Sequence, residues 1–181
     1  MKQYFMTTER LGFSVWEKDD LPLAQKLWGD PKVTALICAS GVFSADDIKN
    51  RLEAEIANNE KYGIQYWPVF ELETGELAGC CGLRPKSDGV FEIGFHLRPD
   101  FWGKEIAVEA AGAVLDRAFG KLGAASVFAG HNPKNVRSAR VMKKLGFRYI
   151  GDEFYAPTGL YHPSYMITQE ERQSSLRKTS L

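Results

Sequence analysis

The chain has 181 residues, of which 44% are hydrophobic and 25% are charged, an ordinary composition for one globular domain. Lysine plus arginine equals aspartate plus glutamate at 23 each, so no overall charge favours nucleic acid or a membrane as a partner. No segment has the apolar length of a signal peptide or a spanning helix, and the three cysteines show no paired spacing. We therefore expect a single domain over residues 1–181, located in the cytoplasm, with reduced cysteines.

Hydrophobic periodicity and turn residues divide the chain into strands and helices. Seven strands are expected, at residues 11–16, 66–73, 77–83, 90–97, 125–129, 147–154 and 161–168. Four helices are expected, beginning near Asp19, Ser44, Gly103 and Asn135. The polar tail from about residue 169 is expected to fray. This pattern predicts an α/β (α+β) fold, with a mixed sheet covered by helices on both faces.

The joint between strand 90–97 and the helix after Gly103 carries the clearest functional pattern. A strand, a tight turn at Pro99 and Asp100, and a helix start together aim unpaired backbone N–H groups at one point. The positive end of the helix dipole lies there too, so the turn is suited to bind an anion such as phosphate. The turn matches neither a Walker A loop nor a dinucleotide-binding fingerprint. An ordinary strand-to-helix turn, with Trp102 packed in the core, has the same local pattern.

Four segments in register resemble one family. Residues 97–110, LRPDFWGKEIAVEA, resemble the acetyl-CoA pyrophosphate loop of the GNAT superfamily of N-acetyltransferases, and more narrowly its RimJ/RimL branch of ribosomal-protein N-terminal acetyltransferases. Residues 135–147, NVRSARVMKKLGF, resemble the second motif of that branch, and TERL at 8–11 and HPSY at 162–165 complete the likeness. The resemblance implies a GNAT fold: a mostly antiparallel sheet of about seven strands with about four helices, in which the central strand pair splays apart.

The resemblance also implies acetyl-CoA as a co-substrate, bound between the splayed strands. Its pantetheine arm would pair with the main chain of Phe95, His96 and Leu97. Its pyrophosphate would lie on the N–H groups of Trp102, Gly103, Lys104, Glu105, Ile106 and Ala107. The basic helix face that includes Lys144 would meet the 3′-phosphate of CoA, although a solvated face has the same composition. The family has glycine where this chain has Glu105, and glycine lets the backbone approach the phosphates more closely.

Asn135 and Ser138 open the second motif. Helix capping alone explains both residue types. The resemblance places Asn135 against the pantetheine amide and Ser138 near the thioester sulfur. Many superfamily members carry a proton-donating tyrosine four residues after that serine, but this chain has Met142, which has no proton to give. Ser138 is therefore the candidate that protonates the departing thiolate, directly or through water.

A base must take the proton of the incoming ammonium, because only the neutral amine attacks a carbonyl. Glu92, on strand 90–97, is the candidate, although an acidic residue on a strand surface is also common. His96 and a chain of waters are the alternatives. A strand N–H near Leu97 would hold the oxyanion. No histidine has ligand-like spacing to cysteines or carboxylates, so no metal is expected.

These features predict an enzyme that moves the acetyl group of acetyl-CoA to a primary amine, of a protein N-terminus or a small molecule, by direct attack in a ternary complex. The alternative is a non-catalytic acyl-CoA-binding or sensor protein of the same fold. Met142 and Glu105 are the two residues that suggest this alternative. The acceptor is expected to bind between the first two helices and the last hairpin. We expect a monomer or homodimer, with no nucleic acid and no membrane as a partner.

Overall fold

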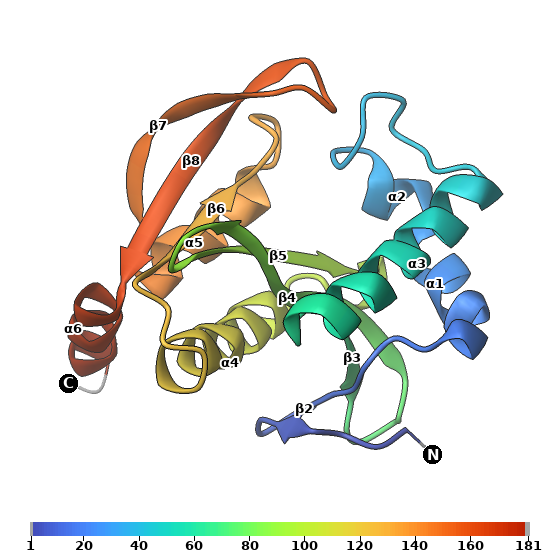
Figure 1. Cartoon of the computed structure of the whole chain (residues 1–181), viewed down its shortest axis with the longest axis horizontal. Coiled ribbons are helices and arrows are strands. Elements are labelled where there is room, and N and C mark those ends of the chain that lie inside the picture. The colour runs from blue at the N-terminus through green and yellow to red at the C-terminus, as the bar shows by residue number, and fades with distance from the viewer. Residues whose placement is uncertain (1, 180–181) are drawn as a thin grey trace.

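The computed structural model describes residues 2–179, and these form one eight-stranded sheet with helices on both faces (Figure 1). The strand order is β1-β2-β3-β4-β5-β6-β8-β7. All neighbouring strands are antiparallel except β5 and β6, which run parallel. The predicted mixed, mostly antiparallel α/β class is therefore confirmed.

The strands are β1 (Met6–Thr7), β2 (Leu11–Phe13), β3 (Tyr66–Glu71), β4 (Leu77–Ser87), β5 (Val90–Leu97), β6 (Ser126–Gly130), β7 (Arg148–Tyr155) and β8 (Leu160–Thr168). The α-helices in the described chain are α1 (Leu21–Trp28), α2 (Pro31–Thr34), α3 (Ala45–Tyr62), α4 (Ile106–Gly120), α5 (Val136–Leu145) and α6 (Gln169–Thr179). Two short 3-10 helices are η1 (Lys18–Asp20) and η2 (Pro99–Phe101). The strands and α-helices beyond the seven strands and four helices expected from the sequence are β1, α2 and α6.

Helices α3 and α5 start and stop where their capping residues predict, whereas α4 begins at Ile106, three residues after the expected Gly103, without a side-chain cap. Ser44 accepts the N–H of Asp47 and the Asp47 carboxylate accepts the N–H of Ser44, which forms a complete capping box at the start of α3. Gly63 ends α3 in the left-handed conformation, and Gly146 ends α5 in the same way. Asn135 caps α5 by accepting the N–H of Ser138 at 3.1 Å.

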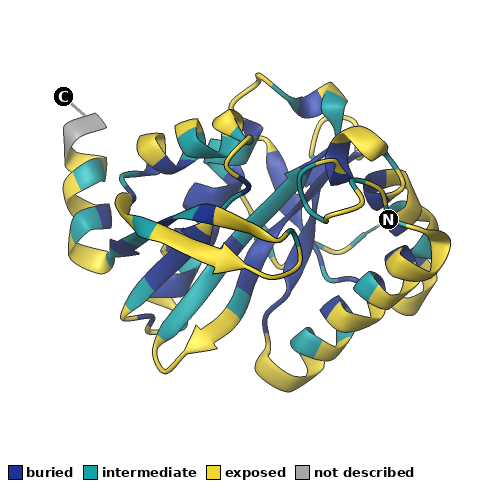
Figure 2. Cartoon of the chain, turned by 90° about the horizontal axis from the view of Figure 1, so that it is seen from above, coloured by how far each residue is buried: buried dark blue, intermediate teal, exposed yellow. Residues whose placement is uncertain are grey.

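The core consists of two apolar clusters on opposite faces of the sheet. One cluster packs under α4 and includes Cys81 and Val114, and the other packs under α1 and α3 and includes Cys80 and Trp28. Neighbouring residues of a strand point to opposite faces. Both cysteines of β4 are therefore fully buried, each in a different cluster. Figure 2 shows the buried residues gathered in the central strands and on the inner sides of the helices.

The parallel pair β5–β6 separates after three residue pairs. The pairing runs from Val90 with Ser126 to Glu92 with Phe128, and no later residue of β5 is paired with β6. Beyond that point β5 continues beside β4, whereas β6 continues beside β8. In Figure 1 the β7–β8 hairpin and β6 turn away from β5. The expected splay of the central pair is therefore present.

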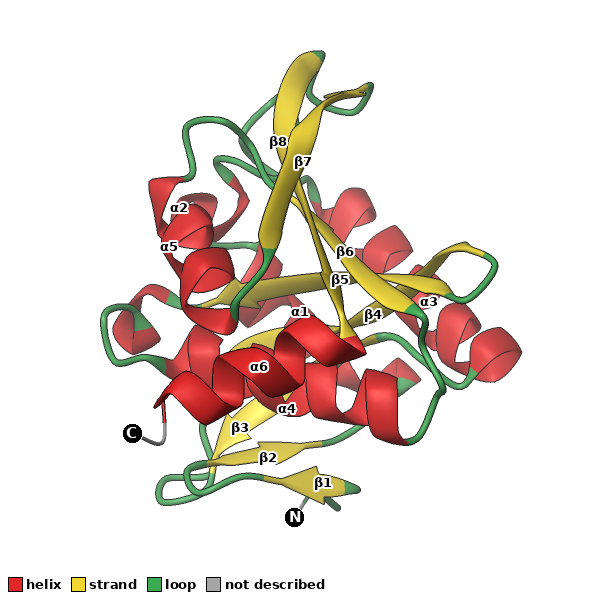
Figure 3. Ribbon diagram, turned by 90° about the vertical axis from the view of Figure 1, so that its left-hand side faces the viewer, coloured by secondary structure: helices red, strands yellow, loops and turns green. Residues whose placement is uncertain are grey.

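The segment after residue 168 does not fray as the sequence predicts, because it forms α6. The carboxylate of Glu171 accepts the N–H of Thr168 at 2.8 Å and so caps the helix start. Arg172 is buried, and its Nε donates to a carboxylate oxygen of Asp116 on α4 at 3.1 Å. Figure 3 shows α6 lying beside α4. The polar sequence of the tail conceals this docking because its partners lie far away in the chain.

Candidate active site

Two cavities meet where β5 and β6 separate. One has a volume of about 350 Å³ and lies between β5, β6, the β7–β8 hairpin and α3. The other has a volume of about 440 Å³ and lies between the start of α4 and α5. Six residues line both cavities: Leu36, Ile37, Phe95, His96, Asn135 and Ser138. We call the first the acceptor cavity, because the predicted base Glu92 lines it, and the second the cofactor cavity, because most residues predicted to bind the cofactor line it. The names follow the sequence predictions.

The start of α4 presents a run of backbone N–H groups to the cofactor cavity. The N–H of Glu109 is the first to bond within this turn, to the carbonyl of Glu105 at 3.0 Å. Within residues 2–179, no protein acceptor receives the N–H groups of residues 103–108. The N–H of Trp102 donates to the carbonyl of Pro99 at 3.0 Å. The predicted run of free donors is therefore corrected to begin at Gly103 instead of Trp102.

The side chain of Trp102 forms part of the wall of the same cavity. Its Nε1–H donates to the carbonyl of Leu97 at 2.9 Å, which ties the turn to the end of β5. The guanidinium of Arg137, from α5, lies 4.2 Å from the centroid of the indole ring. Trp102 thus connects β5, the turn before α4 and α5.

Glu105 occupies a backbone conformation suited to glycine. Its φ is 63°, and it is the only non-glycine residue of the described chain with a positive φ. The left-handed region costs a residue with a side chain about 1–2 kcal/mol. The family glycine at this position, absent here, therefore has a conformational reason as well as a steric one.

The carboxylate of Glu105 also engages the lysine that the sequence assigns to the cofactor. Both carboxylate oxygens accept from Nζ of Lys144 at 2.7 Å, and both side chains are more than half exposed. The pair bridges the start of α4 to the last turn of α5. Lys144 lines the cofactor cavity but is neutralised by Glu105, so a phosphate would have to compete for it.

Beyond Glu92, the main chain of β5 pairs with no strand of the described chain on the side that β6 leaves. The N–H of Arg98 donates to the carbonyl of Ala78, and alternate residues of an antiparallel pair bond in the same direction. The main chain of His96 therefore faces β4 and not the gap, where the resemblance places the pantetheine arm. Phe95 and Leu97 turn their main-chain groups to the gap, where the Leu97 carbonyl already accepts from Trp102.

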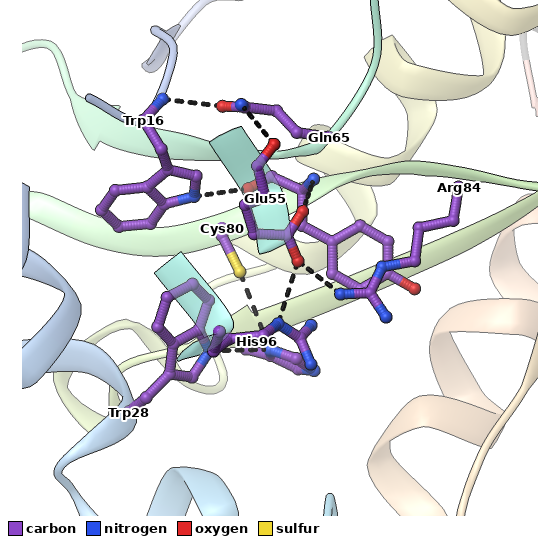
Figure 4. Close-up of polar contacts among 9 residues, drawn as sticks. Trp16, Trp28, Glu55, Gln65, Cys80, Arg84 and His96 are labelled. Carbon is purple, nitrogen blue, oxygen red and sulfur yellow. Dashed lines mark hydrogen bonds and ion pairs between the residues drawn. The ribbon is translucent and has the colours of Figure 1, made fainter. Parts of the chain in front are cut away.

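The ring of His96 lines both cavities, and one of its two nitrogens already accepts a hydrogen bond. Its Nδ1 accepts the indole N–H of Trp28 at 3.1 Å, as Figure 4 shows. Burial, together with the positive charges of Arg51 and Arg84, holds the pKa of His96 well below its usual 6.5. A neutral imidazole whose Nδ1 accepts carries its proton on Nε2. This geometry removes His96 from the candidate bases.

Asn135 and Ser138 lie together at the junction of the two cavities. The Asn135 oxygen is committed to the cap of α5, which leaves its amide N–H groups as donors. The Ser138 hydroxyl has no hydrogen-bond partner among the described residues and lines both cavities. Met142, one turn later, is buried and lines the acceptor cavity, where it offers no proton.

Glu92 lines the acceptor cavity from β5. Burial raises the pKa of its carboxyl above 4.5, while Lys86 and Arg84 oppose the shift and Glu153 adds to it. Within the described chain its carboxylate accepts no hydrogen bond and forms no ion pair. A carboxylate with a raised pKa and free oxygens is suited to accept a proton from an amine.

Tyr66, Arg51 and Arg84 form the opposite wall of the acceptor cavity, and the fully buried Glu55 lies behind them. The sequence predicts no role for these four residues. No local motif marks these four residues, because they come from α3, β3 and β4 and meet only in the folded chain. The last hairpin also lines this cavity, through Glu153, Phe154, Tyr155 and His162. No cluster of potential metal ligands occurs in the part of the chain that the structure describes.

The family model described as Acetyltransferase (GNAT) domain matches residues 10–148, and the chain belongs to this family. It is 30% identical to the uncharacterized protein YkkB of Bacillus subtilis (strain 168) over 148 residues, which covers 80% of this chain and 85% of YkkB. It is also 30% identical to the uncharacterized N-acetyltransferase YnaD of the same organism over 147 residues, covering 81% of this chain and 84% of YnaD.

Solved structures of acetyltransferases have the same fold as this chain. An acetyltransferase (GNAT family) from Bacillus anthracis superimposes with a TM-score of 0.76 at 27% identity, covering 91% of this chain and 98% of that one. RimJ of Mycobacterium smegmatis in complex with CoA-disulfide has the same fold, with a TM-score of 0.75 at 17% identity and coverage of 94% and 89%. Among the described helices, none has the length and apolarity to cross a membrane.

Proposed function

We propose that this chain transfers the acetyl group of acetyl-CoA to a primary amine, by direct attack in a ternary complex. The observation that carries the proposal is the meeting of two cavities at the point where β5 and β6 separate. One cavity presents free N–H groups at a helix start, and the other presents a carboxylate with a raised pKa. We further propose membership of the RimJ/RimL branch, on the four sequence motifs and the shared fold with RimJ.

The residues present fit acetyl-CoA. The N–H groups of residues 103–108 suit a pyrophosphate, and Gly103, at a φ of 75°, adds no side chain that would block it. The main-chain N–H and carbonyl of Phe95 and the N–H of Leu97 suit the amides of the pantetheine arm. The amide N–H groups of Asn135 and the Ser138 hydroxyl then lie near the thioester end.

Acetyl-CoA supplies an acetyl thioester, whose carbon–sulfur bond breaks as the amine nitrogen bonds to the carbonyl carbon. Glu92 takes the proton of the amine, directly or through water. The N–H of Leu97 stabilises the negative charge on the carbonyl oxygen. The Ser138 hydroxyl donates to the thiolate that leaves, since Met142 cannot. The products are an N-acetyl amide and CoA.

The competing proposal is a non-catalytic acyl-CoA binder of the same fold, and two observations favour it: Met142 in place of a proton donor, and Glu105 in the pyrophosphate turn. Incubation with acetyl-CoA carrying a deuterated acetyl group and a panel of primary amines separates the two. The panel should contain amino acids, peptides with free N-termini and polyamines. We expect a deuterated amide and an equal amount of free CoA. Binding of acetyl-CoA with no amide from any amine would favour the binder.

A further inference from the structure

The side chain of Tyr66, on β3, extends over the neighbouring strands β4 and β5, where glycines leave room for its ring. Tyr66 pairs with Gly82 of β4, and Gly82 pairs with Gly94 of β5, so the three residues form one row across the sheet. A Cβ at position 94 would overlap the ring carbons and the hydroxyl oxygen of Tyr66. Tyr66 is buried, yet it reaches over β5 to the acceptor cavity that Gly94 also lines.

Two arginines flank the ring of Tyr66, and a buried carboxylate behind them holds both in position. The guanidinium of Arg84 lies 4.4 Å from the ring centroid of Tyr66 and that of Arg51 lies 5.3 Å from it. Both donate to the same carboxylate oxygen of Glu55, a residue with no exposed side-chain surface. That carboxylate also accepts the N–H of Tyr66 at 2.8 Å, and Figure 4 shows Arg84 and Glu55 in contact. The arginines are therefore positioned before any acceptor binds.

Hydrogen-bond donors predominate in this wall. Burial, with the nearby charge of Glu92, raises the pKa of the Tyr66 hydroxyl, which therefore keeps its proton. Each guanidinium retains N–H groups that bond to nothing else in the described chain, and guanidinium has no acceptor. The Nε2–H of His96 adds a further donor. Three kinds of donor thus face one cavity, so an acceptor-only group such as a carboxylate is complementary to them.

We propose that the amine acetylated here carries a carboxylate, bound by the Tyr66 hydroxyl and the guanidiniums of Arg84 and Arg51. The inference rests on the proposed acetyl transfer and names the class of its substrate: small amino-carboxylic acids. Glu92 then lies ready for the ammonium end of the same molecule.

The charges of the cavity support a zwitterion over a cation. Three cations, Arg51, Arg84 and Lys86, line the cavity with two carboxylates, Glu92 and Glu153, and a third carboxylate, Glu55, pairs with both arginines from behind the wall. A molecule with one positive and one negative group leaves this balance unchanged, whereas a polyamine brings only positive charge towards the arginines. The volume of about 350 Å³ lies at the lower end for small-molecule sites, which favours an acceptor of amino-acid size.

The test compares α-amino acids with their α-carboxamides, which keep the amine and lose the negative charge. We expect kcat/KM to favour the acids by about ten- to a hundred-fold, because a carboxamide leaves charged donors without their partner. The conservative Tyr66→Phe should reduce this preference several-fold, and Arg84→Gln should bring it close to one. Matched controls outside the cavity are Tyr62→Phe on α3 and Arg148→Gln on β7, which should leave the preference unchanged. Equal use of acids and carboxamides by the wild-type protein would overturn the proposal.

Two further measurements separate this inference from the proposed function. Calorimetry with acetyl-CoA on each variant shows whether cofactor binding survives, and we expect it to do so within about two-fold. Calorimetry with N-acetyl amino acids and their carboxamides in the presence of CoA needs no turnover. Tighter binding of the acids by the wild-type protein, lost in Arg84→Gln, supports the carboxylate site even if no amine is acetylated. Equal affinities count against the site even if acetyl transfer occurs.

Discussion

The ring and hydroxyl of Tyr66 occupy the space that any side chain on residue 94 would need, although β4 separates the strands that carry Tyr66 and Gly94. Gly94 is therefore a packing requirement of the acceptor cavity. Because Gly94 has no side chain, the phenol ring of Tyr66 can pass over β5. Tyr66, a residue of β3, therefore reaches the acceptor cavity.

Gly94→Ala should destabilise the fold by about 1–3 kcal/mol, because the added methyl overpacks a buried ring. In a Tyr66→Ala background the same substitution should cost at least about 0.5 kcal/mol less, since the ring is gone. Urea denaturation of the four proteins measures this coupling. Gly120→Ala is the matched control, because a Cβ there meets nothing within 4 Å. Additive effects of the two substitutions would show that Tyr66 does not depend on Gly94.

Glu105→Gly should bind acetyl-CoA about two- to ten-fold more tightly, with the gain shrinking as salt rises. The substitution removes a carboxylate near the pyrophosphate and frees Lys144 from its ion pair. It should also raise stability by about 0.5–1 kcal/mol, because glycine tolerates the left-handed backbone.

Glu105→Ala separates the two effects, since it removes the charge and keeps the Cβ. Calorimetry should find tighter acetyl-CoA binding in this variant too, and thermal unfolding should find no gain in stability. Weaker binding by both variants would mean that the Glu105–Lys144 pair helps to hold the cofactor.

Ser138→Ala should lower kcat by about ten- to a thousand-fold while acetyl-CoA affinity changes far less. The hydroxyl is the candidate donor to the departing thiolate, and general acid groups contribute about 10²–10⁴-fold. Ser138→Thr keeps a hydroxyl and should retain more activity than the alanine variant. Steady-state kinetics at saturating substrates make the comparison. Unchanged kcat in Ser138→Ala would leave Ser138 as a residue of the helix start only.

Glu92→Gln should remove a pH dependence from both activity and stability. Wild-type activity should rise with pH through the raised pKa of Glu92, because only the carboxylate accepts the proton, and the glutamine variant should lack this rise. The folded protein holds the Glu92 proton more tightly than the unfolded chain does. Its contribution to stability is therefore complete below about pH 4.5 and is lost as pH rises through the folded pKa.

Denaturation of wild type and Glu92→Gln across this pH range measures the second effect. The wild-type stability should fall relative to the variant as pH rises. A parallel pH dependence in the two proteins would assign the titration to another group.

The sequence predicts what depends on neighbours in the chain. The capping box of Ser44 and Asp47, the turn before α4 and the cap at Asn135 are local patterns, and each forms where it is expected. The row of Tyr66, Gly82 and Gly94 depends on the register of three strands, which the chain does not display locally. The main-chain direction of His96 likewise follows from its pairing with β4.

Long-range ion pairs account for the other features of the structure that the sequence does not predict. Glu55 joins α3 to β4 through Arg84, and Arg172 docks α6 on α4 through Asp116. In the sequence each of these residues is one more charged group on a polar face. Only the folded chain shows which of them are buried and paired.

A rapid-quench single turnover tests the central claim most directly. An excess of protein is loaded with acetyl-CoA carrying a deuterated acetyl group and is then mixed with a saturating amino acid from the panel. Mass spectrometry measures the products and the mass of the intact protein. Direct transfer predicts that free CoA and the deuterated N-acetyl product appear at the same rate and in equal amounts, with no acetyl group on the protein at any time. Release of CoA ahead of the amide, with a transient acetylated protein, would contradict direct attack. Stable acetyl-CoA binding with no product from any amine would contradict the assignment of acetyl transfer itself.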